Sequence, residues 1–109
     1  MKILVVDDER DIQTLFEQRF RKEIKEKILE FVFAFSGEDA LIYLNKLEHE
    51  AVLILSDINM PGMSGLELLD RIKQTYKKPP PVVMMITAYG DQENLATAKA
   101  VLEARAKER

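Results

Sequence analysis

Four short apolar runs at nearly even spacing constrain the fold of this chain more than any other feature. They are rich in β-branched and aromatic residues: KILVVD (2–7), EFVFAFS (30–36), AVLILSD (51–57) and PVVMMITA (81–88). Because nearly every position in each run is apolar, each run is expected to be a strand that is covered on both faces of a sheet.

The stretches that separate or follow these runs have helical periodicity. Apolar residues recur every three or four positions in the segments 12–20, 40–47, 69–76 and 91–109. Strand therefore alternates with helix along the chain, and this order predicts an α/β fold with a doubly wound parallel sheet and helices on both faces.

Two of the expected helices have the sequence signature of an N-terminal cap. Ser36 precedes Asp39 by three positions. Ser64 precedes Glu67 by the same spacing. In both cases the hydroxyl is placed to accept a hydrogen bond from a free backbone N–H of the first turn.

The composition limits the kind of protein. The 109 residues, 47% hydrophobic and 32% charged, suit one globular domain, and the absence of cysteine excludes disulfides and thiolate chemistry. No apolar run approaches the length of a membrane span or a signal peptide, so we expect no membrane association and a cytoplasmic location. A net charge of −3 without a basic stretch argues against nucleic-acid binding, and His49, between two glutamates, is expected to be a solvated surface residue.

Polar residues stand at the ends of three of the apolar runs. Asp7 and Asp8 close the first run and Asp57 closes the third. Thr87 lies near the end of the fourth. Parallel strands end at a common edge, so if the first and third strands are neighbours, three carboxylates converge there. Mutually repelling carboxylates require a cation, and Mg²⁺ is the hard divalent ion that suits them best.

A simpler interpretation applies to the acidic pair alone. Two adjacent acids at a strand-to-helix junction, such as Asp7 and Asp8, commonly serve as a helix cap and its first-turn neighbour. A metal site is favoured because polar residues follow several of the expected strands at the same edge of the sheet. Glu9 and Asp11 are expected in the first helical turn, where the helix dipole favours them.

Three motifs together resemble a known family. VVDDE (5–9), DINMPGMSGLELL (57–69) and MITAYGD (85–91) stand in the order and spacing of the receiver domain of two-component response regulators, from residue 1 to about residue 100. The resemblance implies a flavodoxin-like sheet with strand order 2-1-3-4. It also implies that Asp57 accepts a phosphoryl group from a histidine kinase or phosphotransfer protein.

The same resemblance implies a role for each residue of the site. Asp8 would ligate Mg²⁺ directly, with Asp7 close to the ion, partly through water, and Asp57 beside it. Asn59 would offer its backbone carbonyl as a further ligand. Thr87 would donate a hydrogen bond to a phosphoryl oxygen and report phosphorylation by moving toward it.

The final residues depart from the family pattern. A receiver domain continues with a fifth strand, ending in a lysine, and a fifth helix, whereas VLEARAKER (101–109) consists of strong helix formers. We therefore expect one domain over 1–109 with four strand-helix units instead of five. Lys99, Lys107 and Arg109 lie on the expected helix and are poor substitutes for that lysine. The exposed edge of the 81–88 strand and the 91–109 helix are expected to pair two copies into a homodimer.

Two other functions compete with phosphate acceptance. One is an interaction or scaffold module, derived from a receiver, that self-associates without signalling. The other is an aspartate-nucleophile phosphatase of the haloacid dehalogenase type, which requires an aspartate two residues after its nucleophile, where this chain has Glu9 after Asp7. The receiver interpretation predicts a protein that accepts phosphate on its own residue and is not a turnover enzyme.

Overall fold

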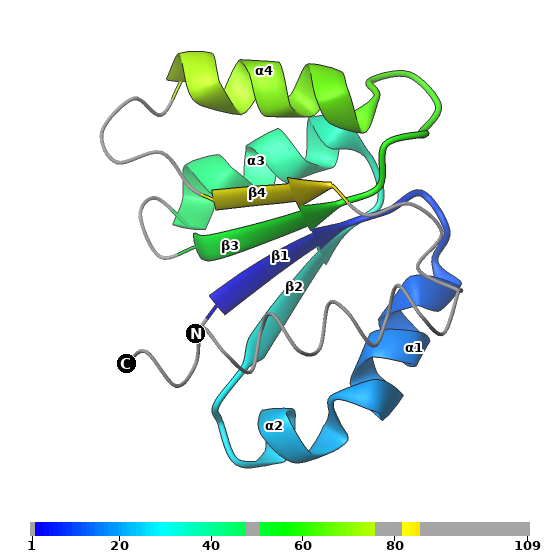
Figure 1. The fold of residues 1–109 in the computed structure, drawn as a ribbon, viewed down its shortest axis with the longest axis vertical. Helices are drawn as coiled ribbons and strands as arrows, with labels where there is room; N and C mark the ends of the chain where they lie inside the picture. Colours follow the sequence, from blue (N-terminus) through cyan, green and yellow to red (C-terminus); the bar gives the residue numbers. More distant parts are fainter. Residues whose placement is uncertain (1, 48–50, 76–81, 86–109) are drawn as a thin grey trace.

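The structure, a computed structural model, describes residues 2–47, 51–75 and 82–85 (Figure 1). His49, Thr87 and the helix expected over 91–109 lie outside the described residues. The elements follow one another as β1 (Lys2–Val6), α1 (Asp11–Arg19), α2 (Arg21–Lys25), β2 (Glu30–Ala34), α3 (Gly37–Leu47), β3 (Ala51–Ser56), α4 (Gly65–Thr75) and β4 (Val82–Met85).

The four strands form one parallel sheet in the order β2-β1-β3-β4, which confirms the expected doubly wound topology. Val6 at the end of β1 pairs with Ala34 of β2 on one side and with Ser56 of β3 on the other. The carboxyl ends of these three strands are therefore level with one another. The residues that follow them emerge at a single edge of the sheet.

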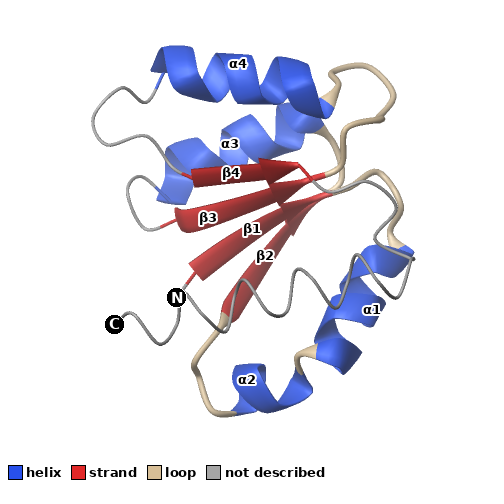
Figure 2. Cartoon of the chain, in the orientation of Figure 1, coloured by secondary structure: helices blue, strands red, loops and turns tan. Residues whose placement is uncertain are grey.

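Helices cover both faces of this sheet (Figure 2). α3 and α4 lie on one face, where they bury alternate residues of the central strands such as Leu4 and Ile54. α1 packs on the other face against the intervening residues, including Val5 and Leu55. The nearly continuous apolar runs are thus explained, because each central strand contributes side chains to two cores.

The helix expected over 12–20 is interrupted, and α2 was not foreseen. α1 ends at Arg19 because Phe20 leaves the helical region, with φ −108° and ψ 25°. The Phe20 ring is fully buried and lies 5.5 Å from the ring of Phe16. Burial of this aromatic side chain stabilises the turn. The short α2 then ends at Lys25, and Lys27, two residues later, adopts a left-handed backbone with φ 61°.

Both predicted N-terminal caps are present. Asp39 donates its backbone N–H to Ser36 Oγ at 3.0 Å, and Glu67 donates to Ser64 Oγ at 3.2 Å. Of the two acids expected in the first turn of α1, Asp11 lies there, whereas Glu9 precedes the helix. In the described segments, no helix combines the length and the apolar character that a membrane crossing requires.

Candidate functional site

The site is built at the carboxyl edge of β1 and β3, the two central strands. Asp7 follows β1 and donates its backbone N–H to Ala34 O at 3.1 Å. Asp57 follows β3 and donates its backbone N–H to Val6 O at 2.9 Å. Each backbone is therefore held by the neighbouring strand, and the two side chains start from fixed positions in the folded sheet.

The three expected carboxylates come together at this edge. One oxygen from each of Asp7, Asp8 and Asp57 lies within 4.8 Å of the other two. Asp7 is buried with 5% of its surface exposed, Asp57 is half-buried and Asp8 is exposed. An oxygen-only group that is fixed on one side and open to water on the other is the kind of site in which Mg²⁺ keeps several water ligands.

The electrostatics of the site show unbalanced negative charge. The pKa of Asp7 is raised to about 6, chiefly by burial and to a smaller extent by the charges of Asp57, Asp8 and Glu9, against the opposing effect of a hydrogen bond from the Glu9 backbone N–H. Burial also raises the pKa of Asp57, and the charge of Asp8 adds to this. A divalent cation would relieve both the desolvation and the repulsion, so the donor set fits such an ion.

Backbone amides partly offset the charge of Asp57. The N–H groups of Ile58 and Asn59 donate hydrogen bonds to its carboxylate, which lowers its pKa and opposes the larger effect of burial. Asn59 is exposed at the start of the β3–α4 loop (57–64). The loop thus orients the Asp57 side chain through its backbone, a contact that the sequence did not indicate.

Two small residues fix the Asp57 backbone. The hydroxyl of Ser56, which is fully buried, donates to the Asp57 carbonyl oxygen at 3.0 Å. Gly65 donates its N–H to Ile58 O at 2.8 Å, and a Cβ on Gly65 would overlap the Asp57 carbonyl oxygen. The backbone of Gly65 therefore lies in close approach to that of Asp57. Ser56 was not foreseen, because a serine inside an apolar run gives no sign of its partner.

Arg10 brings a positive charge to the β1–α1 loop (7–10). Its guanidinium lies 4.6 Å from the centroid of the Phe35 ring, just beyond β2. An arginine stacked on an aromatic face is held in one orientation more firmly than a free one. The pairing links the ends of β1 and β2 and could not be read from positions so far apart in the sequence.

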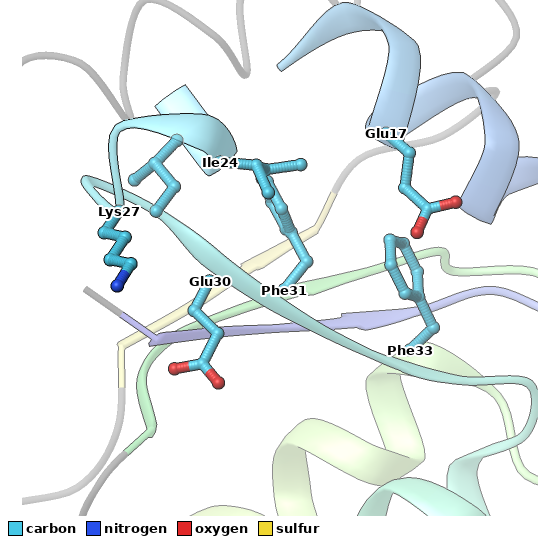
Figure 3. A pocket seen from close by; sticks show the side chains of 7 residues that line it. Glu17, Ile24, Lys27, Glu30, Phe31 and Phe33 are labelled. Carbon is cyan, nitrogen blue, oxygen red and sulfur yellow. The ribbon is translucent and has the colours of Figure 1, made fainter. Parts of the chain in front are cut away.

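A separate hollow lies between β2 and the helices α1 and α2 (Figure 3). The cavity has a volume of about 470 Å³ and is lined by Glu17, Ile24, Lys27, Leu29, Glu30, Phe31 and Phe33. None of the three clustered carboxylates is among these residues. The cavity is therefore distinct from the acidic site.

The fold and the acidic group together define a doubly wound α/β domain with an oxygen-ligand site at the carboxyl ends of its central strands. A family model described as the response regulator receiver domain matches residues 3–108. The chain belongs to this family and is a receiver domain of the two-component response regulators. This membership separates it from the phosphatases of the haloacid dehalogenase type.

Individual relatives agree with this assignment. The transcriptional regulatory protein CpxR of Escherichia coli strain K12 is 33% identical over 91 residues, which are 84% of this chain and 35% of CpxR. The chain thus spans about a third of the length of the curated relatives it matches.

Solved structures share the fold. The N-terminal domain of a response regulator receiver protein from Methanoculleus marisnigri JR1 is 30% identical, with a TM-score of 0.66 and coverage of 92% of each chain. The receiver domain of the hybrid histidine kinase CckA is 26% identical, with a TM-score of 0.69 and coverage of 94% of this chain and 98% of that one.

Proposed function

We propose that Asp57 is the residue that accepts the phosphoryl group, and that Mg²⁺ is held by Asp7 and Asp8 beside it. The observation that supports this most is the convergence of the three carboxylates within 4.8 Å at the edge of the sheet. The pKa values of Asp7 and Asp57 are both raised, which agrees with a site whose negative charge is balanced by a bound cation. The phosphoryl donor would be the phosphohistidine of a histidine kinase or of a phosphotransfer protein.

The proposed reaction is a single displacement at phosphorus. A carboxylate oxygen of Asp57 forms the new O–P bond, the N–P bond of the phosphohistidine breaks, and the imidazole nitrogen leaves with the electron pair. When bound, Mg²⁺ neutralises the charge on the transferred phosphoryl group. The Ile58 and Asn59 amides hold the Asp57 carboxylate in a defined orientation before the donor arrives.

Two further roles follow from the family pattern. The Asn59 backbone carbonyl would be another ligand of the ion, and its position two residues beyond Asp57 suits this. Thr87 would donate its hydroxyl to a phosphoryl oxygen at the end of the fourth strand. Because the phosphoryl group stays on the chain, the domain is a stoichiometric acceptor and not a turnover enzyme.

The wider setting is part of the proposal. Residues 1–109 would act as one domain in the cytoplasm and form a homodimer through the edge of β4 and the 91–109 segment. β4 is an outer strand of the four that the structure describes. Light scattering at tens of micromolar tests the pairing, and the mass of a single chain under those conditions would contradict it.

Acetyl phosphate tests the acceptor directly. With Mg²⁺ present, intact-mass measurement should detect one phosphoryl adduct on the native chain, and none after EDTA treatment or in Asp57→Asn. Asp70→Asn is the matched control, because Asp70 is an exposed aspartate of α4 whose recorded partner is the Gln74 side chain at 3.2 Å. That variant should form the adduct at the native rate.

An adduct that persists in Asp57→Asn would assign the acceptor to another residue. A native chain that remains unmodified over hours would favour the interaction module. In that case the acidic site would persist in the fold without phosphate chemistry.

A further inference from the structure

The first turn of α3 is in direct contact with the β3–α4 loop. Gly37, the first residue of α3, is buried against Met63 of that loop. A Cβ on Gly37 would lie 2.8 Å from Met63 Sδ and 3.0 Å from both its Cβ and its Cγ. Real Cβ atoms are rarely found this close to another heavy atom, so a side chain at position 37 requires Met63 to shift.

A second pair of neighbours strengthens this contact. Gly62, adjacent to Met63, adopts the left-handed backbone with φ 74°. A Cβ placed on it would lie 3.3 Å from Oε2 of Glu38, the residue that follows Gly37. Gly62 and Met63 of the loop therefore lie against Gly37 and Glu38 of α3.

The same loop is anchored in the core on the α3 and α4 face. Met60 and Met63 are each 8% exposed and belong to the cluster that includes Leu44 and Leu68. The flexible end of a methionine can rotate away from a new neighbour. The Met63 Cβ, however, is fixed to the backbone, and it is as close to Gly37 as the Cγ is. Extra volume at Gly37 must therefore move the loop backbone as well as the side-chain end.

A short path connects Met63 to the carboxylate. The loop is closed by the hydrogen bond from Gly65 N–H to Ile58 O at 2.8 Å. The N–H groups of Ile58 and Asn59, within this closed segment, are hydrogen-bonded to Asp57. A displacement at Met63 thus reaches the two amides that orient the Asp57 side chain.

We propose that Gly37 is a positioning residue for the reaction at Asp57, acting through Met63 and the backbone of the β3–α4 loop. Because Gly37 has no side chain, Met63 can pack directly against α3. This packing fixes the β3–α4 loop, so that its Ile58 and Asn59 amides point toward Asp57. This inference rests on the proposed function. It adds a contribution from α3, an element that supplies none of the three clustered carboxylates.

The experiment compares Gly37→Ala in two backgrounds. In the native background the variant should form the acetyl phosphate adduct roughly fivefold to tenfold more slowly, as expected when a reacting group is displaced by a fraction of an ångström. In a Met63→Gly background, where all three crowded atoms are gone, the same change should slow the reaction less than about twofold, because coupling disappears with the contact.

A structural readout accompanies the rates. The backbone amide resonances of Ile58 and Asn59 should shift in Gly37→Ala, and in the double variant they should lie at their Met63→Gly positions. Leu29→Val is the control for lost stability, since Leu29 is buried in the cluster on the other face of the sheet. It should lower the melting temperature and leave these resonances and the adduct rate near native values.

Each outcome decides between the alternatives. Equal slowing by Gly37→Ala in both backgrounds, or unshifted amides, would overturn the positioning role even when the native chain is phosphorylated normally. If the native chain forms no adduct, the proposed function fails by itself. The amide shifts and the Mg²⁺ affinity of the four proteins then still show whether Gly37 positions the loop.

Discussion

Two loops meet at the carboxyl edge of the sheet, and they are built in opposite ways. The β1–α1 loop is mostly exposed beyond Asp7, and the α1 cap residue Arg10 makes no side-chain capping hydrogen bond. The β3–α4 loop is seated in the core through Met60 and Met63 and is followed by the Ser64 cap of α4. One loop supplies charge and the other supplies a fixed shape.

This difference matches the chemistry proposed for each loop. A proposed metal ligand such as Asp8 can adjust when an ion arrives, because the ion itself draws carboxylates into its coordination shell. Asp57, as the proposed nucleophile, gains from being oriented in advance, because misorientation directly slows the displacement. The β3–α4 loop should therefore tolerate added volume poorly, whereas the β1–α1 loop should respond mainly to changes of charge.

The largest effect is expected from Gly65→Ala. The new Cβ would overlap the Asp57 carbonyl oxygen, so the acceptor backbone must shift. We expect a loss of about 1 to 3 kcal/mol in the free energy of unfolding, the usual cost of overpacking. Adduct formation should slow by up to about a hundredfold. Urea unfolding and intact mass measure the two effects, and exposed Leu66→Ala should change neither appreciably. Native behaviour of Gly65→Ala would show that the loop is not fixed as described.

Asp7→Asn tests the charge of the other loop. The pKa of Asp7 is raised from 3.8 to about 6, so between these pH values the folded chain binds a proton that the unfolded chain has released. The contribution of Asp7 to stability therefore falls as pH rises from about 4 to about 6 and is constant above that range. In EDTA, Asp7→Asn should be more stable than the native chain by about 1 to 2 kcal/mol at pH 7.

Melting curves of the two proteins between pH 4 and pH 8 measure this difference, which should be small at the acidic end. Added Mg²⁺ should raise the melting temperature of the native chain and have little effect on Asp7→Asn, since ligand binding to the folded state alone stabilises it. A pH-independent difference would mean that desolvation of the Asp7 carboxylate is not the cause.

The smallest effect is expected at Arg10. Replacing it by lysine keeps the charge and removes the planar group that lies over Phe35, at a cost of about 0.5 to 1 kcal/mol. Combining Arg10→Lys with Phe35→Leu in a double-mutant cycle isolates the pair, because each single change removes the same contact. A coupling energy near zero would show that the stacking does not contribute to the β1–α1 loop.

The sequence predicted those features that depend on local pattern. The strand positions and the sheet order followed from continuous apolar runs and from the family resemblance, and the caps at Ser36 and Ser64 followed from three-residue spacing. The convergence of the carboxylates followed from the position of aspartates at strand ends. Thr87 remains a prediction, because it lies outside the described residues.

Other features depended on contacts between distant segments. The apolar spacing predicted an unbroken helix over 12–20, and nothing in it marks the turn at Phe20 that separates α1 from α2. The packing of Gly37 against Met63 and of Arg10 over Phe35 joins residues that carry no mutual signal in the sequence. Such contacts become visible only when the elements are placed beside one another.

The hydrogen bond between Asp57 N–H and Val6 O relates phosphorylation of the chain to its folding during synthesis. Asp7 and Asp57 are separated by about fifty residues of sequence and become neighbours only when β3 pairs with β1. A chain emerging from the ribosome would therefore have to contain both aspartates, and to pair β3 with β1, before it could be phosphorylated. Phosphate incorporation would then mark molecules that have completed the central sheet, and the modification would report folding as well as signal.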